Sequence, residues 1–400
     1  MRAHEEPQVS ASPSVPLRVI AREWGRIGIT GFGGPPAHIA LLRRLCVQRN
    51  AWLSEAEFED GIAATSLLPG PASTQLAIFC GWRLAGPLGA MVAGACFIMP
   101  GLVIILGLSV LFLENSPPAW VTGAAAGAGA SVPAIAVAAA IGLVPASWRR
   151  VSHATAARVR WSCYLAAGGV AANLAGEFLV AVLLACGLLE WLVSRRAAGG
   201  TVTSTDRSKP AALLIPLAAK GVTIGALGSL AWVALKVGAL SFGGGFVIIP
   251  LMQHDAVHTY HWMTTAQFLG GVALGQVTPG PVVLTVGVVG YAAAGVTGFL
   301  LGILIAFAPS FIFVLVGGRH FDAFRRSAAA QAFLGGAGPA AIGAIGGAAI
   351  TLGLGLTQLW QVGVLVAAGL WLLLLRRSVV AAILAAAAIG VLVALAGGPI

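Results

Sequence analysis

The stretch Leu68-Pro69-Gly70-Pro71 recurs as Thr278-Pro279-Gly280-Pro281 in the second half of the chain, at an offset of 279 − 69 = 210 residues. Both copies interrupt long apolar runs, where proline removes a backbone N–H and glycine loosens a helix. At membrane depth such a break is tolerated only where protein or a water-filled cavity surrounds it. Two matched breaks therefore predict a substrate site at an interface between two repeats.

The composition is typical of a protein embedded in a lipid bilayer. The 400 residues are 58% hydrophobic and 9% charged, whereas a soluble domain carries roughly 25% charged residues. The formal charge of +10 comes from cations in short loops, as in the cytoplasmic loops of membrane proteins. We expect no nucleic-acid partner, because the basic residues do not form a soluble domain. The five cysteines have no C-x-x-C spacing and are interpreted as small packing residues.

Four regions follow one another along the chain. Residues 1–16 are polar and proline-rich and predict a disordered tail without a cleavable signal peptide. Residues 17–193 and 211–400 are two apolar membrane repeats, and the polar, basic residues 194–210 form the linker between them. About 20 apolar residues cross a bilayer. The apolar runs expected to be helical lie at 88–113, 117–144, 161–193 (as two short spans), 296–317, 328–354, 357–375 and 378–396.

An internal repeat accounts for both breaks. The offset of 210 aligns residues 28–71 with 238–281 without a gap, and 14 of these 44 positions are identical. The matches include a Phe-Gly-Gly motif, both prolines of Pro-Gly-Pro, and Trp52 with Trp262. Shared apolar composition would not place these residues in a common register. We therefore infer that the chain arose by duplication.

Loop charge orients the two halves, because cytoplasmic loops carry an excess of Lys and Arg. The loop after the first Phe-Gly-Gly holds Arg43, Arg44 and Arg49, whereas its counterpart at 253–261 holds neither Lys nor Arg. After the third element of each half the bias is opposite, with three arginines at 319–326 in the second half only. The sequence predicts an all-α polytopic membrane protein made of two inverted-topology repeats with broken or re-entrant helices.

The first Pro-Gly-Pro segment has arginines on both flanks, at 43–49 and at Arg83. If both flanks are cytoplasmic, the segment enters the membrane and returns as a helical hairpin that turns at Pro69-Gly70-Pro71. A single kinked helix that crosses the membrane is the alternative, and it would place one group of arginines outside.

Several motifs carry a resemblance to a known family: Phe32-Gly33-Gly34-Pro35, Ala37-His38-Ile39-Ala40, Trp52-Leu53, Leu68-Pro69-Gly70-Pro71, Ser73-Thr74-Gln75 and Gly275-Gln276-Val277-Thr278-Pro279-Gly280-Pro281. Together they resemble the chromate ion transporter family, long-chain two-domain type, over roughly residues 17–395. The resemblance implies a multi-pass protein of the bacterial inner membrane that exports chromate, driven by the proton motive force, and so confers chromate resistance. Family members usually have Asn where this chain has Ala72, which leaves the substrate preference open.

Other functions stay open beside chromate export. Sulfate or another tetrahedral oxyanion has similar size and charge, and no residue here separates it from chromate. A passive anion channel is compatible with the same sequence, and so is a homodimer. A membrane-embedded enzyme would need a cluster of His, Asp or Glu within the spans, but His38, Glu23 and Glu177 are scattered and no nucleotide motif occurs. We therefore expect neither an enzyme nor a cofactor.

Transport of an oxyanion requires hydrogen-bond donors and positive potential at membrane depth. Exposed N–H groups at the start of a helix supply both, and hydroxyls and amides beside a break add further donors. These side chains could instead only cap their own helices. The candidate substrate-binding residues at the breaks are Gly33, Gly34, Pro69, Gly70, Pro71, Ser73, Thr74, Gln75, Gly243, Gly244, Gln276, Thr278, Pro279, Gly280 and Pro281.

Three ionisable residues complete the candidate site. Arg26 and Lys236 form a pair at offset 210, and a cation within an apolar segment suggests function, although snorkelling to the interface is the alternative. His38 is the candidate for proton coupling, and a structural hydrogen bond to the backbone of the break is the other reading. We expect no metal site, because His254 and His258 with their neighbours suit a solvated external loop.

The inverted arrangement predicts the sidedness of two matched positions. Val47→Cys and Val257→Cys should react with a membrane-impermeant thiol reagent from opposite faces of the membrane, because the two loops carry opposite charge bias. The measurement is thiol labelling in right-side-out and inverted vesicles. Labelling of both positions from one face would end the inverted-repeat interpretation.

Overall fold

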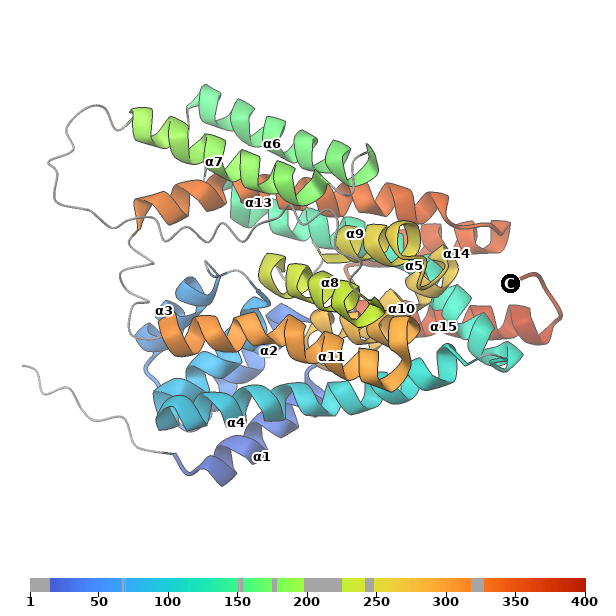
Figure 1. Cartoon of the computed structure of the whole chain (residues 1–400), viewed down its shortest axis with the longest axis horizontal. Helices are drawn as coiled ribbons and strands as arrows, with labels where there is room; N and C mark the ends of the chain where they lie inside the picture. Colours follow the sequence, from blue (N-terminus) through green and yellow to red (C-terminus); the bar gives the residue numbers. More distant parts are fainter. Residues whose placement is uncertain are drawn as a thin grey trace, which may run out of the picture.

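The computed structural model is a bundle of long helices with irregular connections (Figure 1). Within the part of the chain that is described, every regular element is a helix. The residues that the structure describes are 15–66, 68, 70–114, 116–149, 151, 154–174, 178–197, 225–241, 248–317 and 327–400.

The first half supplies helices up to residue 197, so that its last helix extends into the expected linker at 194–210. Its elements are α1 (Leu17–Thr30), α2 (Pro35–Arg43), the π-helix η1 (Arg44–Arg49), α3 (Glu55–Thr65), α4 (Ala72–Phe112), α5 (Ala119–Trp148), α6 (Thr155–Leu174) and α7 (Leu179–Ala197).

The second half begins, within the described residues, at Gly225. Its elements are α8 (Ala226–Leu240), α9 (Ile248–Gln253), the π-helix η3 (His254–Thr259), α10 (Thr265–Val277), the 3-10 turn η4 (Val282–Leu284), α11 (Thr285–Gly317), α13 (Ala328–Leu354), α14 (Leu359–Gly369), the π-helix η5 (Leu370–Leu374) and α15 (Val379–Leu395).

The same local chemistry starts the broken segment in each half. Ser54 accepts a hydrogen bond from the N–H of Glu57, whose side chain returns one to Ser54, and this capping box begins α3. Thr264 and Gln267 form the matching capping box at the start of α10. Each half also has a π-helix just before this cap, η1 and η3. The repeat read from the sequence is therefore also a repeat of local structure.

Each Pro-Gly-Pro motif is the turn of a helical hairpin. In the first half, a Cβ on Gly61 would meet the ring of Phe79, and Arg83 forms an ion pair with Glu57. In each pair the two residues lie the same number of positions before and after Gly70 in the sequence. The helix α3 and the part of α4 before Ala85 therefore run antiparallel. In the second half Gly275 similarly faces Thr285, across Gly280. Gly70 and Gly280 have φ values of +125° and +112°, which favour glycine over other residues.

A second reversal follows each Pro-Gly-Pro. The α4 helix leaves helical geometry at Ala85-Gly86, and a Cβ on Gly81 would lie 2.5 Å from the carbonyl oxygen of Gly89. Residues eight apart in a straight helix are separated by about 12 Å, so residues 72–84 and 87–112 fold back on each other. The α11 helix repeats this turn at Ala294-Gly295.

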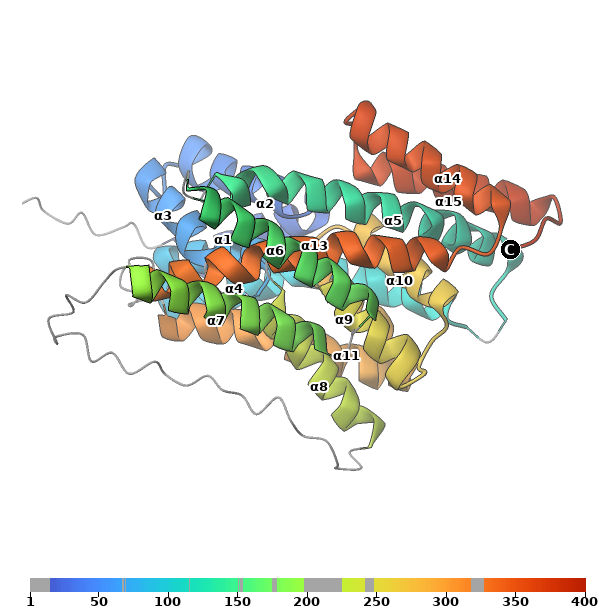
Figure 2. The same ribbon diagram turned by 90° about the horizontal axis from the view of Figure 1, so that it is seen from above.

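The last two helices of each half pack against the long helix of the other half. Figures 1 and 2 show α6 and α7 alongside α13, and α14 and α15 alongside α5. Glycines allow the close approach: a Cβ on Gly343 would lie 1.8 Å from the Leu165 carbonyl oxygen, and one on Gly127 would lie 2.1 Å from that of Ala386. Because α5 and α13 are equivalent in the repeat, this exchange is reciprocal.

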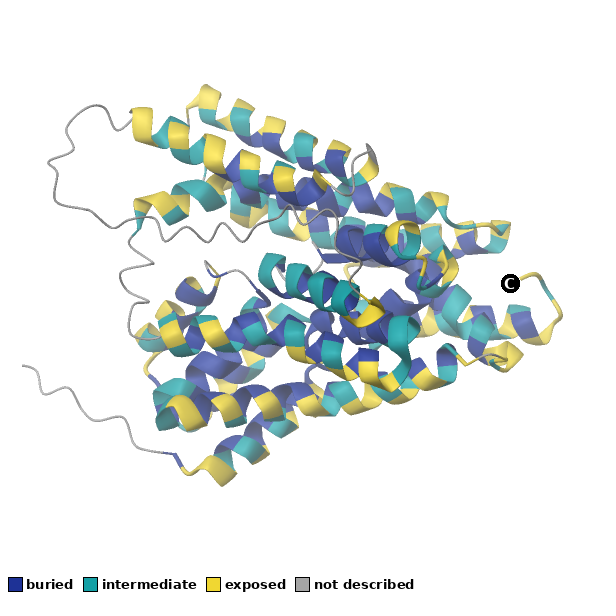
Figure 3. Ribbon diagram, viewed as in Figure 1, coloured by how far each residue is buried: buried dark blue, intermediate teal, exposed yellow. Residues whose placement is uncertain are grey.

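The buried core is shared by both halves, and Figure 3 shows buried positions where the helices pack together and exposed positions on the outside. Trp24 and Phe97 of the first half join Phe268 and Phe299 of the second in one cluster. Large apolar side chains such as Leu304, which is 71% exposed, point outward. Among the described residues, four helical segments are long and apolar enough to cross a membrane: Ala72–Phe112, Ala119–Trp148, Val282–Gly317 and Ala328–Leu354. The first and third of these include the reversals at Ala85-Gly86 and Ala294-Gly295. The protein is an all-α, multi-pass membrane protein.

The exchange of helix pairs makes a prediction about two neighbouring glycines of α13. Gly343→Ala should destabilise the protein by about 1–3 kcal/mol, because the added methyl group overlaps the backbone of α6. Gly346→Ala is the matched control, since its Cβ would have no atom within 4 Å. The apparent unfolding temperature of the purified protein in detergent measures both. Equal temperatures for the two variants would contradict the packing described here.

Candidate functional site

The Pro-Gly-Pro turn of the first half packs against α11, and the Pro-Gly-Pro turn of the second half packs against α4. A Cβ on Gly101 of α4 would lie 2.2 Å from the carbonyl oxygen of Pro279, and one on Gly70 would lie 3.2 Å from Oγ of Ser310 on α11. Gly101 and Ser310 are equivalent positions at offset 209, so the two contacts are reciprocal. The backbone N–H of Gly280 also donates to the carbonyl oxygen of Gly31, 3.1 Å away. The breaks therefore lie at the interface between the halves.

His38 holds the first Phe-Gly-Gly break to the first Pro-Gly-Pro break. Its ring is fully buried and packs edge-on against Phe97. Nε2 lies 2.8 Å from the carbonyl oxygen of Gly31, and Nδ1 lies 3.2 Å from Oγ of Ser73. A carbonyl oxygen can only accept, so in the neutral ring Nε2 donates to Gly31 and Nδ1 accepts from Ser73. This geometry is that of a structural hydrogen-bonding residue.

Four buried donor atoms beside the breaks have no hydrogen-bond partner in the described part of the chain. They are Oγ1 of Thr74, Oγ of Ser241, Nε2 of Gln276 and Oγ of Ser310. Leaving a buried polar group unpaired costs about 1–3 kcal/mol, and most buried groups in native proteins do have a partner. Each of the four lies at or packs against a helix break, so the breaks offer donors that water or a polar ligand can satisfy.

The remaining candidates at the breaks differ in their surroundings. Ser73, Thr74 and Gln75 are buried in the first turn of α4, which Pro71 precedes as the N-terminal cap. Thr278 is buried, but its hydroxyl donates to the carbonyl oxygen of Leu274, 2.7 Å away, as in ordinary helix capping.

The Phe-Gly-Gly glycines are less fully placed. Gly33 is exposed and Gly34 is half-buried, with φ values of +100° and +72°. Pro69, Gly243 and Gly244 lie outside the described residues.

A carboxylate lies beside each candidate cation. The guanidinium of Arg26 is 62% exposed and lies 3.6 Å from the carboxylate of Glu23, which Arg22 and Arg49 also approach. Nζ of Lys236 lies 2.5 Å from Oδ2 of Asp255. Lys236 is therefore balanced by its own carboxylate, whereas Arg26 shares the single carboxylate of Glu23 with two other arginines.

The sequence of both halves matches one family. The family described as "Chromate transporter" covers residues 19–191 and 228–391. The chain belongs to the chromate transporter family. Its relatives include the "Chromate transport protein" of Cupriavidus metallidurans, 32% identical over 86% of this chain and 84% of that protein, and the protein of the same name from Pseudomonas aeruginosa, 33% identical over 82% and 79%.

The "Probable chromate transport protein" of Synechococcus elongatus is 29% identical over 85% of this chain and 86% of that protein. No solved structure matches. These three relatives are named as transport proteins.

Ion pairs close the base of the first hairpin in this chromate transporter family member. Arg83 contacts Glu57, and Arg43 contacts both Glu55 and Glu59. The pKa of Glu57 lies below its ordinary value: burial alone would raise it, but hydrogen bonds from the Ser54 N–H, Arg83 and the Ser54 hydroxyl outweigh that effect. The hairpin is thus fastened on the side away from Gly70.

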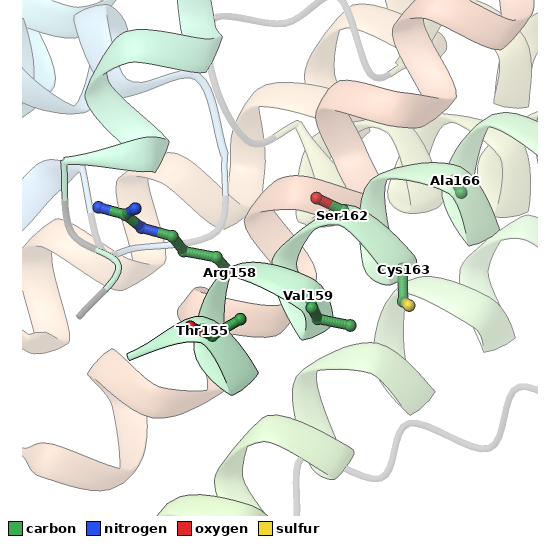
Figure 4. Close-up of a pocket in the computed structure, with 6 residues that line it drawn as sticks. All are labelled: Thr155, Arg158, Val159, Ser162, Cys163 and Ala166. Atoms are coloured by element: carbon green, nitrogen blue, oxygen red, sulfur yellow. The ribbon is translucent and has the colours of Figure 1, made fainter. Parts of the chain in front are cut away.

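Sequence reasoning missed two of the four unpaired donors, Ser241 and Ser310. A signal for each was available, since Ser241 directly precedes the second Phe-Gly-Gly and Ser310 follows Pro309, the counterpart of Pro100. The open hollow of about 380 Å³ in Figure 4 is a different place. It is lined by residues of α6 alone: Thr155, Arg158, Val159, Ser162, Cys163 and Ala166.

The contacts of His38 make a prediction about stability. His38→Leu should lower the free energy of unfolding by about 1–3 kcal/mol, because it leaves the buried Ser73 hydroxyl without its ring partner and breaks the bond to Gly31. His258→Ala, at an exposed position of η3, is the control. Thermal unfolding in detergent measures both, and an unchanged unfolding temperature for His38→Leu would contradict a structural role.

Proposed function

We propose that this protein is a secondary active transporter that exports chromate across the bacterial inner membrane, coupled to the proton motive force, and thereby confers chromate resistance. The observation that carries the proposal is the set of unpaired, buried donors at Thr74, Ser241, Gln276 and Ser310. Membership of the chromate transporter family and the names of the relatives support chromate as the substrate.

Neutral donors suit an anion that must be bound and then released. Each hydroxyl or amide can donate to an oxyanion oxygen, and hydrogen bonds to a charged group contribute about 1.5–3 kcal/mol each. The first turn of α4, at Ala72 and Ser73, adds the partial positive charge of a helix N-terminus. A tetrahedral dianion could replace its water shell with such donors without forming a permanent ion pair.

An inverted relation between the halves would let one site face either side of the membrane in turn. The colour gradient in Figure 1 supports this relation: α4 runs from left to right after its turn, whereas α11 runs from right to left. The opposite charge bias of the matching loops points the same way.

Sulfate and other tetrahedral oxyanions are the second candidate class, favoured by one observation. Ala72 stands where family members usually have Asn, so a side-chain amide that could contact the substrate is absent. A passive channel would need no coupling, and it differs from a carrier in its response to a proton gradient.

Flux into everted membrane vesicles tests the proposal. Chromate uptake should saturate and should depend on an imposed proton gradient, with sulfate as competitor. Ser310→Ala and Thr74→Val should each raise the KM for chromate about tenfold, because each removes a donor worth at least about 1.4 kcal/mol. Ser131→Ala is the control, since that buried hydroxyl already donates to the Ala128 carbonyl oxygen.

Each other outcome has a distinct meaning. Uptake that continues after the gradient is collapsed would favour a channel. Uptake of sulfate without chromate would keep the architecture and change the substrate. An unchanged KM in both Ser310→Ala and Thr74→Val would remove the unpaired donors from the binding site.

A further inference from the structure

Lys236 and Asp255 form a partly buried ion pair that has no role in the transport mechanism proposed above. Nζ lies 2.5 Å from Oδ2, and the two side chains are only 16% and 11% exposed. The pair connects the second half of α8 to the first turn of η3. The ammonium also lies 5.8 Å from the centre of the Trp232 ring, which adds an attractive contact for a cation.

No other charged side chain of the described neighbouring elements offers Lys236 a partner. The helices α9, α10 and α11 contain no Asp, Glu, Lys, Arg or His, and these are elements that pack against α8 or η3. The other titratable groups nearby are His254 and His258 on η3 itself, where His254 contacts Thr259. The carboxylate of Asp255 is therefore the counter-ion on which Lys236 depends.

Such a pair is poor as a purely stabilising device. Removing two charges from water costs several kcal/mol per ion, and an apolar pair of similar size is often equally stable. An ionisable residue in an apolar segment of a membrane protein is by default a functional hypothesis.

The position of Lys236 connects the pair to the candidate site. Ser241, whose buried hydroxyl has no partner, caps the end of α8. Five residues of helix span about 7 Å along the axis, so Lys236 lies within one and a half turns of this donor. An oxyanion that reaches Ser241 would therefore lie about 7 Å along the helix axis from Lys236, the one lysine of the described helices.

The first half joins the equivalent helices with charges of opposite sign, since Glu23 of α1 lies 3.7 Å from Arg49 of η1. At offset 210 the positions of Lys236 and Asp255 hold Arg26 and Leu45. Arg26 pairs with Glu23 on its own helix and is largely exposed, while Leu45 is buried and apolar. Among the described residues, a cation on the first helix that pairs with a carboxylate on the π-helix therefore occurs in the second half and not in the first.

We propose that Lys236 exchanges counter-ions during transport: an oxyanion displaces the carboxylate of Asp255 from the ammonium, and Asp255 displaces the oxyanion when it leaves. The exchange rests on the proposed function, because it makes Lys236 an oxyanion-binding residue of that site. Asp255 is then a specificity-determining residue that competes with weakly bound anions and disfavours retention of the substrate.

Anion binding to the purified full-length protein in detergent tests the exchange without requiring transport. The dissociation constants for chromate and for sulfate are measured from ligand-dependent shifts of the unfolding temperature. Asp255→Asn should lower the dissociation constant three- to tenfold, because the competitor is gone. Lys236→Met should raise it at least tenfold. His258→Gln, at an exposed position of the same π-helix, should leave it unchanged.

A double-mutant cycle separates exchange from a structural role. In the Lys236→Met background, Asp255→Asn should have no further effect on the dissociation constant. If the pair only stabilises the fold, both single variants lower the unfolding temperature without ligand and leave the dissociation constant unchanged, which overturns the proposal. If Asp255→Asn does not fold, the Lys236→Met variant alone tests the exchange. An unchanged dissociation constant in Lys236→Met would also overturn the proposal.

The result also distinguishes the two proposals. Anion binding that responds to both variants supports the exchange even if vesicles show no gradient-dependent flux, in which case the transport mechanism fails alone. Normal chromate flux together with unchanged binding in both variants overturns the exchange and leaves the transporter in place. Absence of any chromate or sulfate binding to the parent protein overturns the exchange.

Discussion

The fold depends on one constraint: backbone groups freed by a broken helix must find partners when the surroundings are hydrocarbon. Here the partners come from the other half of the chain or from a buried side chain. The carbonyl oxygen of Gly31, at the end of α1, accepts from the N–H of Gly280 and contacts the ring of His38. Each half therefore supplies hydrogen-bond partners or packing to the helix breaks of the other half, which connects the duplication of the chain to its broken helices.

Close contact between the halves follows from this requirement, and glycine makes it sterically feasible. The hydrophobic effect does not drive helices together within lipid, so association relies on packing at short distance. A Cβ would overlap backbone atoms at Gly101 beside Pro279, at Gly127 beside Ala386 and at Gly343 beside Leu165. These are contacts between elements of different halves, which explains why so many of the 54 glycines lie inside helices despite their cost there.

The sequence predicted features whose causes are local. Pro-Gly-Pro interrupts a helix because of its own chemistry, and α6 and α7 correspond to the two short spans expected within 161–193, although they extend beyond that run at both ends. Family membership followed from motifs and is confirmed by the comparison. The packing of α6 and α7 on α13, and of α14 and α15 on α5, was not predictable, because the sequence of a helix does not identify which distant helix it contacts. Ser310 was missed for the same reason, since its proximity to Gly70 is a long-range contact.

Charge placement shows the same limit and leads to a mechanistic point. Arg26 and Lys236 are matched in sequence, yet the exposed Arg26 shares Glu23 with two other arginines, whereas the largely buried Lys236 has Asp255 to itself. A fixed, unpaired cation at the breaks would hold a dianion too strongly to release it, because Coulomb attraction grows as water is excluded. Neutral donors such as Thr74 and Ser310 bind a dianion less strongly, and the charge of Lys236 is already balanced by Asp255. Passage of an ion through a membrane needs binding that is strong enough to admit the ion and weak enough to let it leave. In the proposed exchange, Lys236 meets both conditions because it binds the oxyanion and then pairs again with Asp255.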